Sequence, residues 1–502
     1  MSFIVGIDIG TTNTKAVAFT DEGAVLATAG QSYSALAGPD GRHELDPALL
    51  LKATVAVLKE VVGQTAHQEG PGQTAHRERL AGISLSCAMH SLIVVDKEGK
   101  PLTNAITWAD LRSQPYAEAL KGSVAGNRIY RQTGTPIHPM SPLSKLLWLK
   151  DKEPAIFRQA GKFISIKEWL WWQLFGKYQV DHSIASATGL FDIYHFAWYG
   201  ESLALAGITP DQLSVPVPCT HIETVLTPSY RSSLGLPEGL PFVIGSSDGC
   251  LANLGSRAMR PGETTLTIGT SGAVRMTAAA PEHDPRERIF NYILTDKLYI
   301  SGGATNNGGG VVQWYIGEFL GKKGTDPKEL SDLLAAADTV APGCDGLVFL
   351  PYLQGERAPI WDADAKGVFF GIRSAHGQRH FMRAVLEGIT YSLFQVGESL
   401  EETIGPIEHI YASGGFTHSA TWLQLVADVF SKKVYVTNVA DASAIGAAIL
   451  GLYALGITGD LEASAEMIRV QETYEPDEGR HRIYQERFAV FAQLYDRLKD
   501  LM

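Results

Sequence analysis

Ile9-Gly10-Thr11-Thr12 near the start of the chain recurs as Ile268-Gly269-Thr270-Ser271, 259 residues further on. Each copy is a turn of small and hydroxyl residues between two runs of β-forming residues. These runs are Phe3 to Ile9 and Lys15 to Thr20 in the first half, and Thr264 to Ile268 and Ala273 to Thr277 in the second. A chain of 502 residues is also longer than one hydrophobic core normally organises. The repeat therefore predicts an internal duplication, with a domain boundary near residue 247.

The charge balance excludes several classes of function. Lys and Arg number 42 and Asp and Glu number 54, which gives a formal net charge of −12. General binding to nucleic acid or to anionic membranes needs a basic surface, so we expect neither partner. The apolar stretch from Ser443 to Gly459 is interrupted by glycines and is shorter than the roughly 20 residues of a membrane span. It predicts a buried helix instead.

The cysteines and the N-terminus indicate a compartment. Four cysteines lie far apart and form no Cys-x-x-Cys pair: Cys87, Cys219, Cys250 and Cys344. The first apolar run has no basic residues before it and is interrupted by Asp8, so no secretory signal is visible. Both features are typical of a protein of the reducing cytoplasm.

A short tandem repeat separates two predicted elements. Gly63-Gln64-Thr65-Ala66-His67 recurs as Gly72-Gln73-Thr74-Ala75-His76, with Gly70 and Pro71 between the copies. Glycine and proline at this density predict a solvated loop insertion. Its two histidines are too few to predict a metal site.

Both Gly-Thr turns have the chemistry of a phosphate-binding loop. Glycine leaves backbone N–H groups accessible to phosphate oxygens, and the hydroxyls of Thr11, Thr12 and Thr270 complete the shell. The chain contains no Walker A sequence. One such turn alone is equally well an ordinary hairpin, but two of them predict two walls of one nucleotide cleft. Asp8 precedes the first turn by two residues, and a carboxylate beside a phosphate implies Mg²⁺ between them.

Asp248 follows a predicted buried strand at the proposed domain boundary. An aspartate there either caps a turn or accepts the proton of a substrate hydroxyl during phosphoryl transfer. The surrounding Gly245-Ser246-Ser247-Asp248-Gly249 also matches the G-x-S-x-G nucleophile elbow. Ser247 would then be a hydrolase nucleophile, with Asp428 and either His409 or His418 as partners. That alternative leaves both Gly-Thr turns unexplained.

Further polar and glycine-rich segments follow predicted strands. Met89-His90 and Trp108-Ala109-Asp110-Leu111-Arg112 offer groups that bind hydroxyls or an anion, although each is equally an ordinary strand-end residue. Gly308-Gly309-Gly310 and Ser413-Gly414-Gly415-Phe416 allow a flat ligand ring to approach the backbone, or two helices to pack closely. Ser419 is a candidate N-cap for a helix that includes Trp422 and Phe430.

Taken together, these residues resemble the FGGY carbohydrate kinases of the sugar kinase–Hsp70–actin superfamily. The most specific segment is Gly367-Val368-Phe369-Phe370-Gly371-Ile372 followed by His380-Phe381-Met382-Arg383-Ala384-Val385-Leu386-Glu387, which is similar to the C-terminal signature of that family. The N-terminal signature is recognisable from Met140 to Leu149 and departs from the family pattern at Lys152. The resemblance extends from Gly6 to about Gly456, most of the chain.

The resemblance implies an α/β protein with two RNase H-like domains around a central cleft. Residues 1–247 would bind the sugar and supply a phosphate loop, and residues 248–502 would bind ATP. Asp248 would be the general base, and Asp8 and Asp248 would organise Mg²⁺. The expected ATP and phosphate contacts are Gly10, Thr11, Thr12, Gly269, Thr270, Gly309, Gln313, Gly415 and Ser419; the expected substrate contacts are Met89, His90, Trp108, Asp110, Arg112 and Gly249.

Two branches of the family fit the substrate residues differently. Xylulose kinases typically have Gln-Met-His-Gly and Asp-Asn where this chain has Ala88-Met89-His90-Ser91 and Asp248-Gly249. The gluconate kinase branch looks closer at Ala88–Ser91, at Thr107–Asp110 and at Thr133–Met140. Gluconate has a carboxylate, which needs a cationic or donor-rich partner. The candidates for that partner are His90, Arg112, His138 and Lys145.

The sequence thus predicts an ATP-dependent kinase that phosphorylates the terminal hydroxyl of an open-chain sugar acid, D-gluconate, with D-xylulose as the alternative. A non-catalytic ATP-binding module of the same superfamily and a Ser247 hydrolase are the alternatives from other classes. The sequence leaves the oligomeric state open, a homodimer included.

Overall fold

The computed structural model describes residues 2–66, 79–322 and 327–502. His67, His76 and the second copy of the tandem repeat lie outside these residues, so the predicted loop insertion stays a prediction.

The first half of the chain builds a six-stranded sheet in the order β14-β15-β6-β1-β2-β3. The predicted meander is confirmed: β1 (Ser2–Ile9), β2 (Asn13–Thr20) and β3 (Val25–Ser32) are consecutive antiparallel strands. β6 (Arg79–Cys87) pairs parallel with β1, and β15 (Phe242–Ser247) pairs parallel with β6. β14 (Ile222–Glu223) adds a short antiparallel edge.

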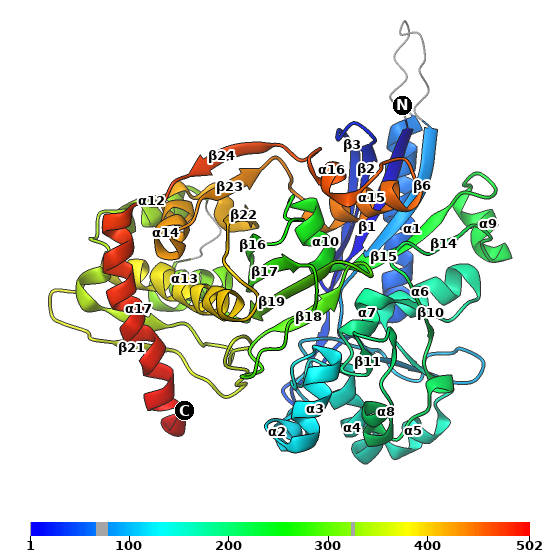
Figure 1. Cartoon of the computed structure of the whole chain (residues 1–502), viewed down its shortest axis with the longest axis horizontal. Coiled ribbons are helices and arrows are strands. Elements are labelled where there is room, and N and C mark those ends of the chain that lie inside the picture. Colours follow the sequence, from blue (N-terminus) through cyan, green and yellow to red (C-terminus); the bar gives the residue numbers. More distant parts are fainter. Residues whose placement is uncertain (1, 67–78, 323–326) are drawn as a thin grey trace, which may run out of the picture.

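The second half repeats this topology. β16 (Glu263–Ile268), β17 (Gly272–Ala278) and β19 (Tyr299–Thr305) form an antiparallel meander, and β22 (His409–Ser413) and β23 (Val434–Thr437) continue it in parallel. β18 (Phe290–Ile293) and β24 (Val470–Tyr474) are the added edges of a seven-stranded sheet. Each half thus has a meander extended by two parallel strands. The duplication and the two RNase H-like α/β domains are confirmed, and they form the right and left lobes of Figure 1.

Helices and short strands surround the two sheets. The other helices of the first half are α1 (Pro47–Ala66), α2 (Gln114–Leu120), α3 (Val124–Thr133), α4 (Pro142–Lys152), α5 (Pro154–Gln159), α6 (Ile166–Phe175), α7 (His182–Ser186), α8 (Gly200–Ala206) and α9 (Pro228–Leu234). Those of the second half are α11 (Gly309–Trp314), α12 (Pro327–Asp338), α13 (Gln378–Thr403), α14 (Ala420–Phe430), α16 (Leu461–Ala465) and α17 (Glu478–Leu498). The small strands are β4 (Leu36–Ala37), β5 (His43–Leu45), β7 (Ile93–Val95), β8 (Ala105–Ile106), β9 (Lys162–Ile164), β10 (Gln179–Asp181), β11 (Phe191–Asp192), β12 (Ala197–Trp198), β13 (Val215–Val217), β20 (Val348–Leu350) and β21 (Val368–Phe370).

Two helices at the junction of the lobes, α10 (Asp248–Gly255) and α15 (Ala442–Ala454), cross each other. α15 belongs to the second half by sequence but packs on β1, β2 and β6 of the first sheet, where it lies in orange among blue strands in Figure 1. α10 shares an apolar cluster with β18 and β19 of the second sheet. α15 therefore fixes the second half of the chain to the sheet of the first. α15 confirms the predicted buried helix, although it ends at Ala454.

Glycines allow these two helices to approach closely. A Cβ at Gly446 would lie 2.0 Å from the carbonyl oxygen of Leu251, and a Cβ at Gly255 would lie 1.9 Å from that of Ala442. Backbone atoms cannot rotate away as a side chain can.

We expect Gly446→Ala to lower the free energy of unfolding by roughly 2–3 kcal/mol, because the added methyl group forces α10 and α15 apart. Thermal and urea denaturation measure this loss. Gly459→Ala is the matched control, since a Cβ there meets nothing within 4 Å. Equal stability of the two variants would contradict the close crossing.

The outer parts of the molecule complete the core. The C-terminal helix α17 packs on α13 and α14 through Phe488, Phe491 and Leu494. All four cysteines are buried and unpaired. Among the described helices, none has the length and apolar character that crossing a membrane requires.

Candidate active site

Three parallel strands of the first sheet end side by side. Ile9 of β1 is paired with Cys87 of β6, and Cys87 is paired with Ser247 of β15. The residues that follow these strands are therefore neighbours: the Gly10–Thr12 turn, Met89-His90 and Asp248. Ligands in open α/β sheets bind outside such carboxyl ends.

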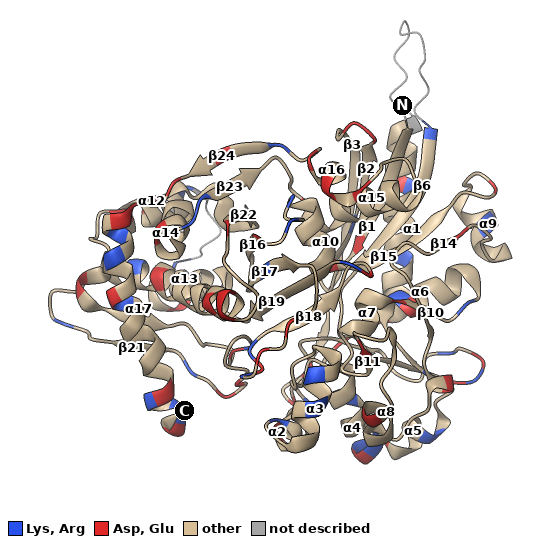
Figure 2. Ribbon diagram, viewed as in Figure 1, with Lys and Arg blue, Asp and Glu red and all other residues tan. Residues whose placement is uncertain are grey.

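Asp8 and Asp248 place two carboxylates at this edge. Burial and the nearby Asp248 carboxylate raise the pKa of Asp8 to about 7, although Ser86 Oγ donates a hydrogen bond to Asp8 Oδ1 at 2.7 Å. Burial also raises the pKa of Asp248, against the opposing effect of the Arg275 guanidinium. Figure 2 shows charged segments near β1 and β15, where the two lobes meet. Two buried carboxylates that repel each other favour a bound cation.

Asp248 is the first residue of α10, and only one of its oxygens is engaged. Its Oδ1 accepts a hydrogen bond from the Gly249 backbone N–H at 2.7 Å. Its Oδ2 accepts none from the part of the chain that the structure describes. A carboxylate held at one oxygen and open at the other can accept a proton from a ligand.

Ser247 is not a nucleophile, so the hydrolase alternative is wrong. Its side chain is fully buried and is the N-cap of α10, accepting from the Cys250 N–H and from Ser183 Oγ at 2.8 Å. His409 pairs with Glu263, and Asp428 pairs with Arg480 on another face of the second lobe. No histidine within residues 2–66, 79–322 and 327–502 hydrogen-bonds to Ser247.

The second Gly-Thr turn packs against the start of α11. The Gly309 N–H donates to the Gly269 carbonyl at 2.7 Å, and the Gly310 N–H donates to the Thr270 carbonyl at 3.0 Å. Gln313 lies on the same helix one turn later. Beside this contact is a cavity of about 230 Å³ lined by Thr270, Asn306, Asn307, Gly310, Val311, Trp314, Leu353 and Gln354. The structure thus brings Gly269, Thr270, Gly309 and Gln313 together.

The glycines after β22 lie beside the same turn. β22 is the parallel neighbour of β16, and a Cβ on Gly414 would lie 2.4 Å from the Ile268 carbonyl oxygen. Cβ atoms on Gly269 and Gly415 would meet nothing within 4 Å, so both backbones face open space. Ser419 is the N-cap of α14, with its Oγ accepting from the Trp422 N–H at 3.3 Å. That helix start is confirmed, whereas a nucleotide contact of Ser419 stays a prediction.

Gly249 lies between two larger side chains. A Cβ there would be 3.0 Å from Met89 Cε and 3.2 Å from Arg275 Nε. Arg275, on β17, is partly buried, and its guanidinium makes no hydrogen bond or ion pair with the described residues. The sequence analysis missed it because the strand pairing alone brings it to Asp248. A side chain larger than hydrogen at position 249 would displace Met89 or Arg275.

His90 is held from both sides of its ring. Nδ1 lies 2.7 Å from the Ala187 carbonyl oxygen and therefore bears the proton, so Nε2 accepts from Tyr292 Oη at 3.2 Å. Burial, with Lys145 nearby, lowers the pKa of His90 to about 3. The ring is neutral and fully engaged, and it offers no charge to an anion.

The fold separates Trp108 from Asp110 and Arg112, which pair with each other. Arg112 forms ion pairs with Asp110 at 2.7 Å and with Glu44 at 2.5 Å, and its guanidinium stacks over Trp148 at 4.4 Å. Two carboxylates already balance its charge. Trp108 instead lies under the guanidinium of Arg357, 4.6 Å from the ring centre.

Arg357 was not found by sequence reasoning. It lies in the long connection between β20 and β21 of the second lobe, directly before the cis peptide Ala358-Pro359. The only signal was a Gly-Glu-Arg-Ala-Pro segment shortly before the C-terminal signature. Its contact with Trp108 joins residues 249 positions apart, which no local pattern reveals.

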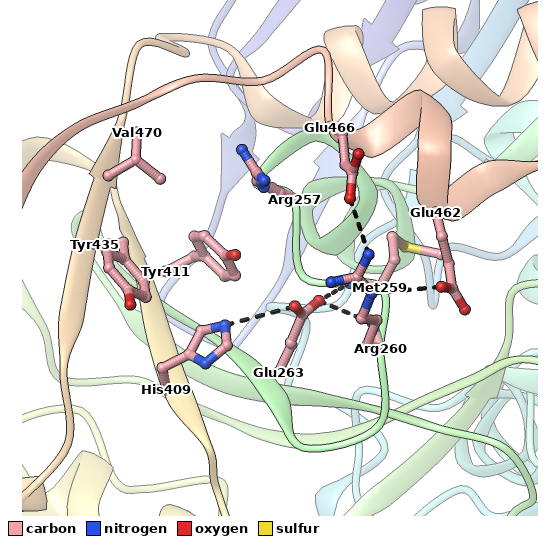
Figure 3. A pocket seen from close by; sticks show the side chains of 10 residues that line it. All are labelled: Arg257, Met259, Arg260, Glu263, His409, Tyr411, Tyr435, Glu462, Glu466 and Val470. Atoms are coloured by element: carbon pink, nitrogen blue, oxygen red, sulfur yellow. Dashed lines mark hydrogen bonds and ion pairs between the residues drawn. The ribbon is translucent and has the colours of Figure 1, made fainter.

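A second, larger cavity lies away from these residues. Figure 3 shows Arg260 and Glu263 in it, with His409, Tyr411 and Tyr435 on the neighbouring strands. It measures about 300 Å³. Its charged groups satisfy one another: Arg260 pairs with Glu462 and Glu466, and Glu263 pairs with His409. Neither Gly-Thr turn nor either central aspartate lines it.

Comparisons with known proteins agree with this geometry. Residues 3–255 match the N-terminal domain, and residues 264–455 the C-terminal domain, of the FGGY family of carbohydrate kinases. The gluconokinase of Bacillus subtilis is 42% identical over 501 residues, covering 98% of this chain and 95% of that protein. Crystal structures of a gluconate kinase and of a ligand-bound xylulose kinase, both from Lactobacillus acidophilus, each superpose with a TM-score of 0.92 at 33% identity. Each comparison covers 99% of this chain, and 98% and 99% of the respective structures.

Proposed function

Because the chain belongs to the FGGY family of carbohydrate kinases, we propose that it transfers the γ-phosphoryl group of ATP to the terminal hydroxyl of D-gluconate. The observation that supports this reaction most directly is the pair Asp8 and Asp248 at the carboxyl edge of the first sheet, beside the first Gly-Thr turn. The alternative of a non-catalytic ATP-binding module leaves the open Oδ2 of Asp248 without a use.

In the proposed reaction, Asp248 Oδ2 accepts the proton of the substrate hydroxyl as its oxygen attacks the γ-phosphorus. Burial favours this transfer because a raised pKa makes the Asp248 carboxylate a stronger base. Arg275, whose charge lies near Asp248, limits that rise and keeps the carboxylate ionised before reaction. The N–H groups of both Gly-Thr turns would bind the phosphates.

Magnesium is the expected cofactor, and the residues fit it. Mg²⁺ in phosphoryl-transfer sites takes one or two carboxylates together with water and phosphate oxygens. Asp8 and Asp248 provide two carboxylates whose mutual repulsion the ion would relieve. When bound, the ion would neutralise the charge that develops on the transferring phosphoryl group.

Three observations favour gluconate over xylulose. The gluconokinase of Bacillus subtilis is 42% identical, whereas the xylulose kinase of the same organism is 28% identical. Position 88 is Ala and position 249 is Gly, where xylulose kinases typically have Gln and Asn. An asparagine side chain at position 249 would have to displace Met89 or Arg275. The solved gluconate kinase and the solved xylulose kinase superpose on this chain with the same TM-score, so the fold does not distinguish the two substrates.

ADP release from Mg-ATP by the purified protein tests this proposal, run in parallel with D-gluconate, D-xylulose and no sugar. We expect strong stimulation by gluconate alone. Stimulation by xylulose alone would overturn the proposal that gluconate is the substrate and would leave the proposed kinase activity standing. Slow hydrolysis of ATP that no sugar stimulates would favour the non-catalytic module.

We place the protein in the cytoplasm, a proposal that rests on its four buried, unpaired cysteines. A homodimer stays a prediction, which sedimentation at assay concentrations would test.

A further inference from the structure

A buried arginine without an acidic partner lies in the sugar half of the proposed cleft. Arg357 is 8% exposed. Its Nη2 donates to the Thr305 carbonyl at 3.0 Å, but its Nε is buried and has no hydrogen-bond partner among the described residues. A buried guanidinium with an unsatisfied N–H costs several kcal/mol unless an anion joins it.

The charge of the adjacent Glu356 favours the charged form of Arg357, but the two side chains form no ion pair among the described residues. The oxygens of Glu356 accept from the Asn306 backbone N–H, from Asn307 Nδ2 at 3.1 Å and from the Arg357 backbone N–H at 2.8 Å. These contacts fasten the loop to the end of β19. Burial raises the pKa of Glu356 to about 7, so its charge is also reduced. The side chain of Arg357 forms no ion pair within the described residues.

Apart from Glu356, the charged groups that act on Arg357 are Asp248 and Arg275, and the others are neutral. Its guanidinium lies over Trp108, and its charge acts on His90, His138 and Asp248. Burial lowers the pKa of both histidines far below neutrality, so neither competes for an anion. Of the other cations predicted for this role, Arg112 is paired twice, and Lys145 donates to the carbonyls of His90 and Met140.

We infer that Arg357 is the residue that binds the substrate carboxylate, through the guanidinium N–H groups that the Thr305 carbonyl leaves unused. The inference rests on the proposed function, since it assumes an acidic open-chain substrate whose far end is held at Asp248. It makes Arg357 a specificity-determining residue, provided by the second lobe to a sugar site on the first. The carboxylate would thereby bridge the two lobes.

The test compares D-gluconate with D-gluconamide, a neutral acceptor of the same length, in the wild type and in Arg357→Met. We expect the wild type to favour gluconate. The variant should lose on the order of a hundredfold in kcat/KM for gluconate, mainly through KM, and only a few-fold for gluconamide. Methionine keeps apolar bulk over Trp108, and Arg357→Lys, which keeps the charge, should recover part of the gluconate preference.

Arg275→Met is the matched control, because Arg275 also forms no ion pair among the described residues and lies at the reacting end. This variant should lower kcat/KM for both acceptors by the same factor. An equal fall in kcat/KM for both acceptors in Arg357→Met would assign Arg357 to the phosphoryl group and overturn the inference. A variant that keeps the wild-type kcat/KM for gluconate would also overturn it. A wild type that favours the neutral acceptor would overturn the substrate proposal as well. Thermal denaturation confirms that each variant is folded.

Discussion

Asp248→Asn is expected to abolish phosphoryl transfer while leaving the fold and ATP binding nearly intact. Asparagine keeps the size of the side chain and still accepts from the Gly249 N–H through its amide oxygen. It cannot take up the proton of the substrate hydroxyl, and losing a general base typically costs about 10²–10⁴-fold in rate. We expect a fall in kcat of about a thousandfold or more, measured by ADP release with saturating gluconate.

Ser247→Ala is the control that separates the base from its neighbour. It removes the N-cap of α10 and the hydrogen bond from Ser183, which should cost about 1 kcal/mol of stability. Its kcat should stay close to that of the wild type. Full activity in Asp248→Asn would refute the base, and inactivity of a folded Ser247→Ala would revive a role for the serine.

The strand-level part of this architecture was readable from the sequence for a physical reason. A meander is local: β1, β2 and β3 pair in chain order, β16 pairs with β17, and β17 pairs with the nearby β19. Each first turn has glycine where the backbone reverses. The start of α14 was predicted for the same reason, since Ser419 signals it within one turn.

What the sequence could not predict depends on contacts between distant segments. The exchange of α15 onto the first sheet is invisible in its apolar composition, because any buried surface would satisfy it. The four residues proposed for the carboxylate were chosen by type, and the fold commits each of them elsewhere. Arg357 satisfies the requirement instead because a loop of the second lobe lays it over Trp108.

Asp8→Asn is expected to inactivate the enzyme and, at the same time, to stabilise the metal-free protein. Without the Asp8 carboxylate the proposed Mg²⁺ position retains only Asp248, so we expect turnover to fall about a hundredfold or more at saturating gluconate. Raising the Mg²⁺ concentration should recover part of it. Titration of activity with Mg²⁺ measures both effects.

The stabilisation has a definite pH dependence. The folded-state pKa of Asp8 is raised from 3.8 to about 7, so the folded protein binds a proton there more tightly than the unfolded chain does. The stability that Asp8 contributes is therefore fully present below the lower value and is lost as the pH rises through about 7. The variant with asparagine at position 8 does not titrate there and has no such loss of stability. In chelator, Asp8→Asn should melt a few degrees above the wild type at about pH 8, and this advantage should shrink toward about pH 5.

The surface change Asp211→Asn is the matched control for that stabilisation, because an exposed carboxylate pays no burial cost. It should leave both the melting temperature and its pH dependence unchanged. With Mg-ATP added, the wild type should melt above Asp8→Asn, since bound ligand stabilises only the protein that can hold it. If Asp8→Asn melted below the wild type in chelator at both pH values, Asp8 would be a structural residue, and its burial beside Asp248 would need another explanation.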